Sequence, residues 1–157
     1  MRWLGVDVGR RRIGLALSDG SATLARPWKT ITASGATPAS AAADLASQLV
    51  AWREADEDIA EIAGIVVGLP RRLNGDDTEQ TAAARVFADV LSVRTGLVVV
   101  LQDERLTSRE AESRLAVREK DWRRRKEKLD AAAAAIILQD YLDARPSSAP
   151  PALPQEP

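Results

Sequence analysis

The sequence predicts an α/β protein with a mixed five-stranded sheet, in which three antiparallel strands precede two parallel strands and helices cover both faces. Three observations support this prediction. The chain opens with three short apolar segments that are joined by tight turns. Two continuous apolar runs follow, at 62–70 and 97–101, and such runs are typical of parallel strands with both faces covered. Helical patterns separate and follow these runs.

The first three strands are predicted at 2–8, 13–17 and 25–32. Their connections are short, and 18–21 has the composition of a turn, so we expect an antiparallel meander. Pro27 in the third strand predicts an edge or bulged position, because proline donates no hydrogen bond to a neighbouring strand.

A helix is predicted from Pro38 to about Ala55, with Thr37 before it. Leu45, Leu49 and Trp52 recur at spacings of four and three residues. This spacing places them on one apolar stripe, which we assign to core packing.

The run 62–70 is predicted to be a central parallel strand. A helix from about 78 to 94 follows it, and Gly96 is expected to cap that helix. The run 97–101 is predicted to be the next buried strand. Three apolar side chains of the helix are expected to point inward: Val86, Val90 and Leu91.

The C-terminal third is predicted to contain a helix at 109–117, a charged connector at 119–127 and a last helix at 129–142. The last helix includes five consecutive alanines, 131–135. Side chains this small predict that the helix lies close against the sheet.

The length of 157 residues fits one domain with a hydrophobic core. We place the folded domain at 1–144 and a proline-rich, disordered tail at 145–157. No apolar stretch approaches the roughly 20 residues that span a bilayer, and the N-terminus lacks a signal-peptide pattern. The expectation is a cytoplasmic protein without a membrane partner.

The chain contains neither histidine nor cysteine. This composition excludes Ser-His and Cys-His catalytic pairs, and it also excludes imidazole and thiolate metal sites. Any catalysis must therefore use carboxylates, lysines or hydroxyls. Carboxylates favour hard cations such as Mg²⁺ or Mn²⁺.

The net charge of −1 conceals an uneven distribution. The segment 105–128 holds ten basic and five acidic residues, a balance of +5, so the remainder of the chain carries −6. A basic block on an acidic body indicates an anionic partner, although a solvated helical face is the competing interpretation. Trp3 and Trp28 are assigned to packing, whereas Trp122 stands among charges.

Three acidic residues are candidates for a metal site. Asp7 is flanked by valines in the first strand, Glu104 follows the last strand directly after Asp103, and Asp130 begins the predicted last helix. Acidic residues are common at helix starts because the helix dipole stabilises their negative charge there, so the position of Asp130 alone is weak evidence for a metal site. If the three converge, cations must separate their charges, and two metals about 4 Å apart are a known arrangement for phosphodiester hydrolysis.

Four motifs resemble those of one bacterial family. They are Asp7–Gly9 with Ile13–Ala16; Gly68–Pro70 with Asn74–Gly75 and Thr78–Gln80; Asp103–Thr107; and Lys128–Ala133 with Ile136–Leu138 and Tyr141–Leu142. Together they resemble the YqgF (RuvX) family of RNase H-like proteins. Its members are described as Holliday junction resolvases and as nucleases that process the 5′ end of pre-16S ribosomal RNA.

The resemblance implies an RNase H-like fold and a metal-dependent nuclease. It assigns catalysis and the binding of Mg²⁺ or Mn²⁺, as two ions, to Asp7, Glu104 and Asp130. It also implies nucleic-acid contacts at Arg105, Thr107 and Lys128. Charge adds further candidates for nucleic-acid binding: Arg10, Arg11, Arg12, Arg123, Arg124, Arg125 and Lys126.

Several functions remain open at this point. The substrate is either precursor ribosomal RNA, with ribosomal precursor particles as partners, or a four-way DNA junction. A resolvase must cut two strands symmetrically and needs a homodimer, whereas a processing nuclease can act as a monomer. Two hypotheses from different classes compete with these: a nucleic-acid-binding module without catalysis, and an actin-like ATPase, in which Asp-x-Gly followed by Ile-Gly also occurs.

Overall fold

The computed structural model describes residues 1–33, 37–72, 74–104 and 122–145, and for 122–127 the description covers the backbone alone. The helix predicted at 109–117 and nearly all of the predicted tail at 145–157 lie outside the described residues. Every strand and most helices that the sequence predicts fall within them.

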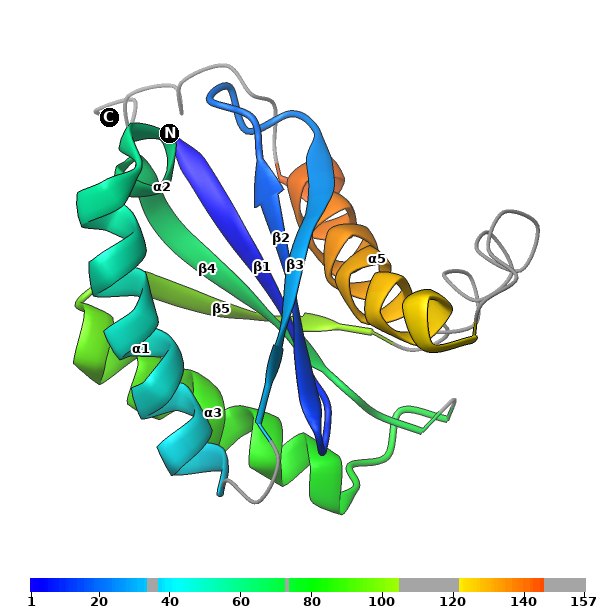
Figure 1. Cartoon of the computed structure of the whole chain (residues 1–157). Coiled ribbons are helices and arrows are strands. Elements are labelled where there is room, and N and C mark those ends of the chain that lie inside the picture. The colour runs from blue at the N-terminus through cyan, green and yellow to red at the C-terminus, as the bar shows by residue number, and fades with distance from the viewer. Residues whose placement is uncertain (34–36, 73, 105–121, 146–157) are drawn as a thin grey trace, which may run out of the picture.

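The core of the fold is a five-stranded sheet with the strand order β3-β2-β1-β4-β5 (Figure 1). Its strands are β1 Arg2–Val8, β2 Arg12–Ser18, β3 Ala25–Thr32, β4 Ile62–Leu69 and β5 Val98–Asp103. The pairs β1–β2 and β2–β3 are antiparallel, whereas β4 runs parallel to both β1 and β5. The predicted mixed sheet is therefore confirmed.

Helices cover both faces of the sheet (Figure 1). On one face, α1 (Pro38–Ala55) and α3 (Glu79–Thr95) pack on alternate residues of the central strands, and the short α2 (Glu57–Ala60) follows α1. On the other face lies α5 (Trp122–Ala144). Within the described ranges, no helix has the length and apolar character needed to cross a membrane.

Local sequence explains where the helices begin and end. The side chains of Thr37 and Ser40 exchange hydrogen bonds with each other's backbone at the start of α1, and Thr78 and Thr81 do the same at the start of α3. Gly96 ends α3 with a φ of 69°, a left-handed conformation that favours glycine.

Two predictions about burial are wrong. Val86 is 46% exposed, because the inward face of α3 is centred on Phe87 with Ala84, Ala88 and Leu91. Strand β5 is half-buried rather than buried, and its Val98 is 62% exposed. A strand at the edge of a sheet has a neighbour on one side only, and a continuous apolar run does not reveal that position.

The last helix begins earlier than predicted. Helix α5 starts at Trp122, so the backbone at 122–127 is helical and the connector prediction is wrong there. Arginine, lysine and glutamate are good helix formers, which explains how this charged segment extends the helix. Asp130 consequently lies in the third turn of α5 rather than at its start, and a role in capping the helix is excluded.

The outer strand β3 has both features that Pro27 predicts. It lies at the edge of the sheet, and its pairing with β2 shifts so that Leu15 faces Lys29 while Ala16 faces Pro27. Trp28 at this bulge packs edge-on against Trp52 of α1, with ring centroids 5.0 Å apart. Lys29 Nζ lies 4.4 Å from both rings, which adds a cation–π contact between β3 and α1.

Glycines on the sheet let the backbone of α5 come unusually close. A Cβ on Gly5 would lie 2.8 Å from the carbonyl oxygen of Ala134, and a Cβ on Gly14 would clash with the carbonyl oxygen of Asp130. The facing side of α5 is correspondingly rich in alanine, as Ala134 and Ala135 pack against the sheet. The predicted close packing of this helix is confirmed.

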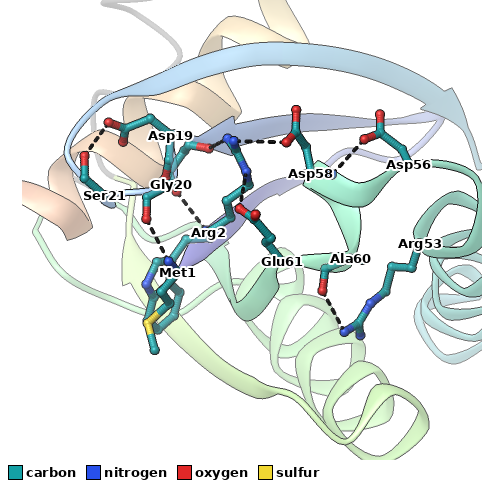
Figure 2. A network of polar contacts seen from close by, with 12 residues as sticks. Met1, Arg2, Asp19, Gly20, Ser21, Arg53, Asp56, Asp58, Ala60 and Glu61 are labelled. Carbon is teal, nitrogen blue, oxygen red and sulfur yellow. Dashed lines mark hydrogen bonds and ion pairs between the residues drawn. The ribbon is translucent and has the colours of Figure 1, made fainter.

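The opposite end of β1 is fastened by a polar network (Figure 2). Arg2 contacts Asp58 and Glu61 at 3.3 and 3.1 Å and donates to the Ser18 carbonyl oxygen at 3.0 Å. The α-amino group of Met1 donates to the Gly20 carbonyl oxygen at 2.7 Å. These contacts join the start of β1 to α2 and to the β2–β3 turn.

We expect Gly14→Ala to destabilise the protein by about 1–3 kcal/mol, the usual cost of overpacking, because the added Cβ would meet the backbone of α5. Gly20→Ala is the matched control, since the nearest atom to its Cβ would be 3.9 Å away. Denaturant unfolding of both variants measures the difference. Equal stabilities would contradict the close approach of α5 to β2.

Candidate active site

Two carboxylates meet across the middle of the sheet. Asp7, near the end of β1, pairs with Gly14, and their positions face α5. Glu104 follows β5, and its backbone amide donates to the Leu69 carbonyl oxygen at 3.3 Å. Between β1 and β5 lies Gly68 of β4, where a Cβ would be 2.6 Å from Glu104 Oε2. The missing side chain at Gly68 therefore makes room for Glu104 to reach toward Asp7.

The pair is electrostatically unfavourable when both members are ionised. Burial raises the pKa of Asp7 to about 6, although a hydrogen bond with Glu104 opposes the shift. Burial raises the pKa of Glu104 to about 9, and the charge of Asp7 and their shared hydrogen bond add to the shift. Such a pair holds a proton between its members at neutral pH unless a cation compensates the charge.

Asp130, which lies on α5, forms an acidic cluster with Asp7 and Glu104. Its negative charge contributes to the raised pKa of Asp7, so α5 brings it near the pair. Its Oδ2 lies 3.1 Å from Arg12 Nε, and the two side chains are 28% and 31% exposed. The family resemblance implied that the three acids share one site, but the sequence did not predict that Asp130 would pair with an arginine.

The donor set fits a divalent cation in its chemistry. Glu104 Oε2 is buried without a hydrogen-bond partner among the described residues, and an unpaired buried carboxylate oxygen is a group that a hard cation satisfies. Within the same part of the chain, however, no three acidic side chains already stand in a metal-binding arrangement. Asp7 and Glu104 form the preassembled part, and Asp130 is held by Arg12.

The predicted nucleic-acid-binding residues fall into two groups. Arg10 and Arg11 are exposed in the β1–β2 turn. The backbone amide of Gly9 closes this turn by donating to the Arg12 carbonyl oxygen at 2.9 Å. Lys128 is exposed on α5, two residues before Asp130. Arg12 lies against Asp130, as described above, and the other candidates cannot be placed. Arg105 and Thr107 lie outside the described residues, as do the side chains of Arg123, Arg124, Arg125 and Lys126.

Sequence reasoning missed two residues that shape the site. Gly68 and Gly14 hold no ligand, but they create the space for Glu104 and for α5. Gly14 directly opposes Asp7 in the sheet. The signal was present in the sequence, because a glycine inside a strand often marks the close approach of another backbone.

Comparison with known proteins places the chain among nucleases. A family model described as "RuvX: Holliday junction resolvase" matches residues 1–144. A relative from Anaeromyxobacter sp. strain Fw109-5, named "Putative pre-16S rRNA nuclease", is 43% identical over 145 residues, which cover 92% of this chain and 98% of the relative. One from Chloroflexus aggregans with the same name is 44% identical over 142 residues, covering 90% and 93%.

Among solved structures, the chain resembles RuvC of Thermus thermophilus in complex with a Holliday junction substrate. The TM-score is 0.52 at 15% sequence identity, and the match covers 92% of this chain and 95% of RuvC. At this identity the likeness concerns the fold, and it confirms the predicted RNase H-like architecture.

The raised pKa values predict how the stability of the metal-free protein depends on pH. A carboxyl whose folded pKa exceeds its unfolded value binds more protons in the folded state, so the free energy of unfolding falls as pH rises between the two values. For Glu104 this window runs from 4.5 to about 9. With a chelator present, we expect Glu104→Gln to remove most of this decline and to stabilise the protein at neutral pH by roughly 1–3 kcal/mol, the range for an unsatisfied buried group.

Thermal unfolding across this pH range, with chelator or with added Mg²⁺, measures the effect. Glu54→Gln is the control, because Glu54 is exposed near the end of α1. If the stability of Glu104→Gln depends on pH in the same way as that of the wild-type protein, the unfavourable electrostatics of the Asp7–Glu104 pair would be refuted.

Proposed function

The chain belongs to the RuvX family, and from this membership we propose that it is a divalent-metal-dependent nuclease that hydrolyses phosphodiester bonds in structured nucleic acid. The observation that carries the proposal is the buried pair of Asp7 and Glu104. Two carboxylates that are costly to ionise together serve no purpose in stabilising the fold, whereas hydrolysis of a polyanion by hard cations requires such ligands.

We assign metal binding to the three acids. Asp7 and Glu104 would hold Mg²⁺ or Mn²⁺, and Asp130 would join them as a ligand, with two ions as the proposed number. A divalent ion at such a site supplies Lewis acidity, which activates water and offsets charge at the phosphate. The pairing of Arg12 with Asp130 orients that carboxylate.

Basic residues around the acids would bind the phosphate backbone. Arg10 and Arg11 project from the turn after Asp7, and Lys128 is exposed on α5 near Asp130. Positive groups at these positions neutralise phosphates on either side of the reacting bond and fix the register of the substrate. Arg12 lies closer to the acids. Its Nε contacts Asp130, and the other N–H groups of its guanidinium would donate to a phosphate.

For the substrate, we propose the 5′ end of precursor 16S ribosomal RNA. This assignment comes from the names of relatives that are 43% and 44% identical over nine-tenths of the chain. Ribosomal precursor particles are then the natural partners, the chain can act as a monomer, and its location is the cytoplasm.

The alternative substrate is a four-way DNA junction. The description of the matching family model favours it, and so does the fold shared with RuvC. A resolvase has to place two acidic clusters at symmetric positions of one junction, so this alternative requires a homodimer.

Cleavage by the purified protein tests the proposal directly. We expect cutting of pre-16S leader RNA when Mg²⁺ or Mn²⁺ is present and none with a chelator. Asp7→Asn keeps the size of the side chain but removes a ligand charge, and we expect it to reduce the rate by at least about 10²-fold, since loss of one essential charged contact in an active site costs several kcal/mol.

A four-way DNA junction and single-stranded DNA are offered in parallel. Paired symmetric nicks in the junction, together with a dimer in solution, would transfer the assignment to the resolvase. Asp89→Asn is the control, because Asp89 is an exposed acid on α3. Undiminished cutting by Asp7→Asn would refute the mechanism based on the three acids.

A further inference from the structure

Arg12 places a positive charge directly at the acidic cluster. It begins β2 two residues before Gly14, and side chains two residues apart along a strand point to the same face of the sheet. That face is the one on which α5 lies, because a Cβ on Gly14 would meet the backbone of Asp130. The 3.1 Å contact between Arg12 Nε and Asp130 Oδ2 agrees with this placement. A guanidinium thus already neutralises one of the carboxylates that we assign to divalent ions.

The other two acids lack such a countercharge. In the part of the chain that the structure describes, neither Asp7 nor Glu104 forms an ion pair with a basic side chain, and Glu104 Oε2 has no hydrogen-bond partner. A divalent ion that binds this pair displaces no other cation. One that binds Asp130 has to compete with Arg12. The two parts of the cluster should therefore differ in their affinity for divalent ions.

Arg12 can leave Asp130 without disturbing the core. Its side chain is 31% exposed, and among the described residues Asp130 is the one acid with which it forms an ion pair. Ion pairs with this much solvent around them contribute little to the stability of a fold. A phosphate is an alternative partner, because the N–H donors of a guanidinium match phosphate oxygens in a bidentate arrangement. The same side chain can therefore serve two anions in turn.

We propose that Arg12 is a built-in countercation, which competes with a divalent ion for Asp130 until a substrate phosphate binds its guanidinium. The proposal rests on the proposed nuclease function and adds an order of binding to it. Without nucleic acid, the protein binds one divalent ion tightly, at Asp7 and Glu104. Ion binding at Asp130 and phosphate binding at Arg12 then strengthen each other, because each event removes the competitor of the other.

The competing interpretation is that Arg12 only fixes the side chain of Asp130 as a metal ligand. The two interpretations predict opposite signs. If Arg12 only fixes the ligand, its removal weakens ion binding, whereas removal of a competitor strengthens it. The structure favours competition, because with Arg12 in contact with Asp130 no three acids within the described ranges stand in a metal-binding arrangement.

Ion binding without nucleic acid tests the competition. The full chain is freed of metal with a chelator and then titrated with Mn²⁺, and calorimetry and electron paramagnetic resonance count the bound ions. Arg12→Gln removes the competing charge, whereas Arg12→Lys keeps it. Arg11→Gln is the matched control, because it removes the same charge from the exposed neighbouring residue. Thermal unfolding establishes that each variant is folded.

For the wild-type protein we expect one tightly bound ion and a second that binds at least about tenfold more weakly, as for one charge-assisted contact. Arg12→Gln should tighten the second ion by about this factor and leave the first nearly unchanged, and Arg12→Lys should stay close to the wild type. Asp130→Asn, added to Arg12→Gln, should abolish the gain. Two ions of equal affinity in the wild type, a weakened second ion in Arg12→Gln, or the same gain in Arg11→Gln would overturn the proposal.

Nucleic-acid binding in a chelator tests the change of partner, and fluorescence anisotropy with a hairpin RNA measures it. Asp130→Asn leaves the guanidinium of Arg12 to the phosphates, so this variant should bind the RNA about tenfold more tightly than the wild type. Asp143→Asn is the matched control, because it removes an equal charge from an exposed position of α5. Equal gains in the two variants, or a gain of the same size when Arg12→Gln is also present, would contradict the exchange.

Cleavage separates this proposal from the proposed function. A wild-type protein that cuts nucleic acid with Mg²⁺, while Arg12→Gln leaves ion binding unchanged, would refute the role of Arg12 and support the nuclease. A wild-type protein that cuts no substrate, while Arg12→Gln gains an ion that depends on Asp130, would do the reverse. If neither protein bound an ion, both proposals would be overturned.

Discussion

The distance between α5 and the sheet is the constraint on which the site depends. At Gly5 and Gly14 the helix backbone occupies space that a side chain would otherwise fill. Asp130 is carried on that helix, so its separation from Asp7 follows from how closely the helix packs. The same principle acts at Gly68, where the absent side chain leaves room for Glu104. Three glycines, which have no reactive side chain, thus set the positions of the three acidic residues.

In the absence of a cation, the buried pair of Asp7 and Glu104 lowers the stability of the fold. Burial raises the pKa of both Asp7 and Glu104, the charge of Asp130 adds to the shift of Asp7 and the charge of Asp7 to that of Glu104, so their ionisation at neutral pH works against folding. The rest of the fold offsets the cost through the apolar layer beneath α1 and α3 and through the Arg2 network at the far end of β1. Asp130, by contrast, has the countercharge of Arg12 beside it.

Much of this architecture was predictable because it depends on local patterns. Short apolar segments joined by turns located β1 to β3, Pro27 indicated the bulged edge, and Gly96 marked the end of α3. The errors in the exposure of Val86 and Val98 arise where distant segments decide. The early start of α5 instead follows from local helix propensity, which the sequence analysis did not apply to this charged segment. Convergence of the acids followed from the family resemblance, whereas the pairing of Arg12 with Asp130 joins residues more than a hundred positions apart, which no local pattern reveals.

The location of Asp130 on α5 has a consequence for synthesis of the chain. Asp7 is made early, but the third acid and the helix that carries it come after all five strands. A chain that folds as it leaves the ribosome can form the sheet before α5 has emerged. The acidic cluster is therefore completed only after α5 has been synthesised, later than the sheet that carries Asp7.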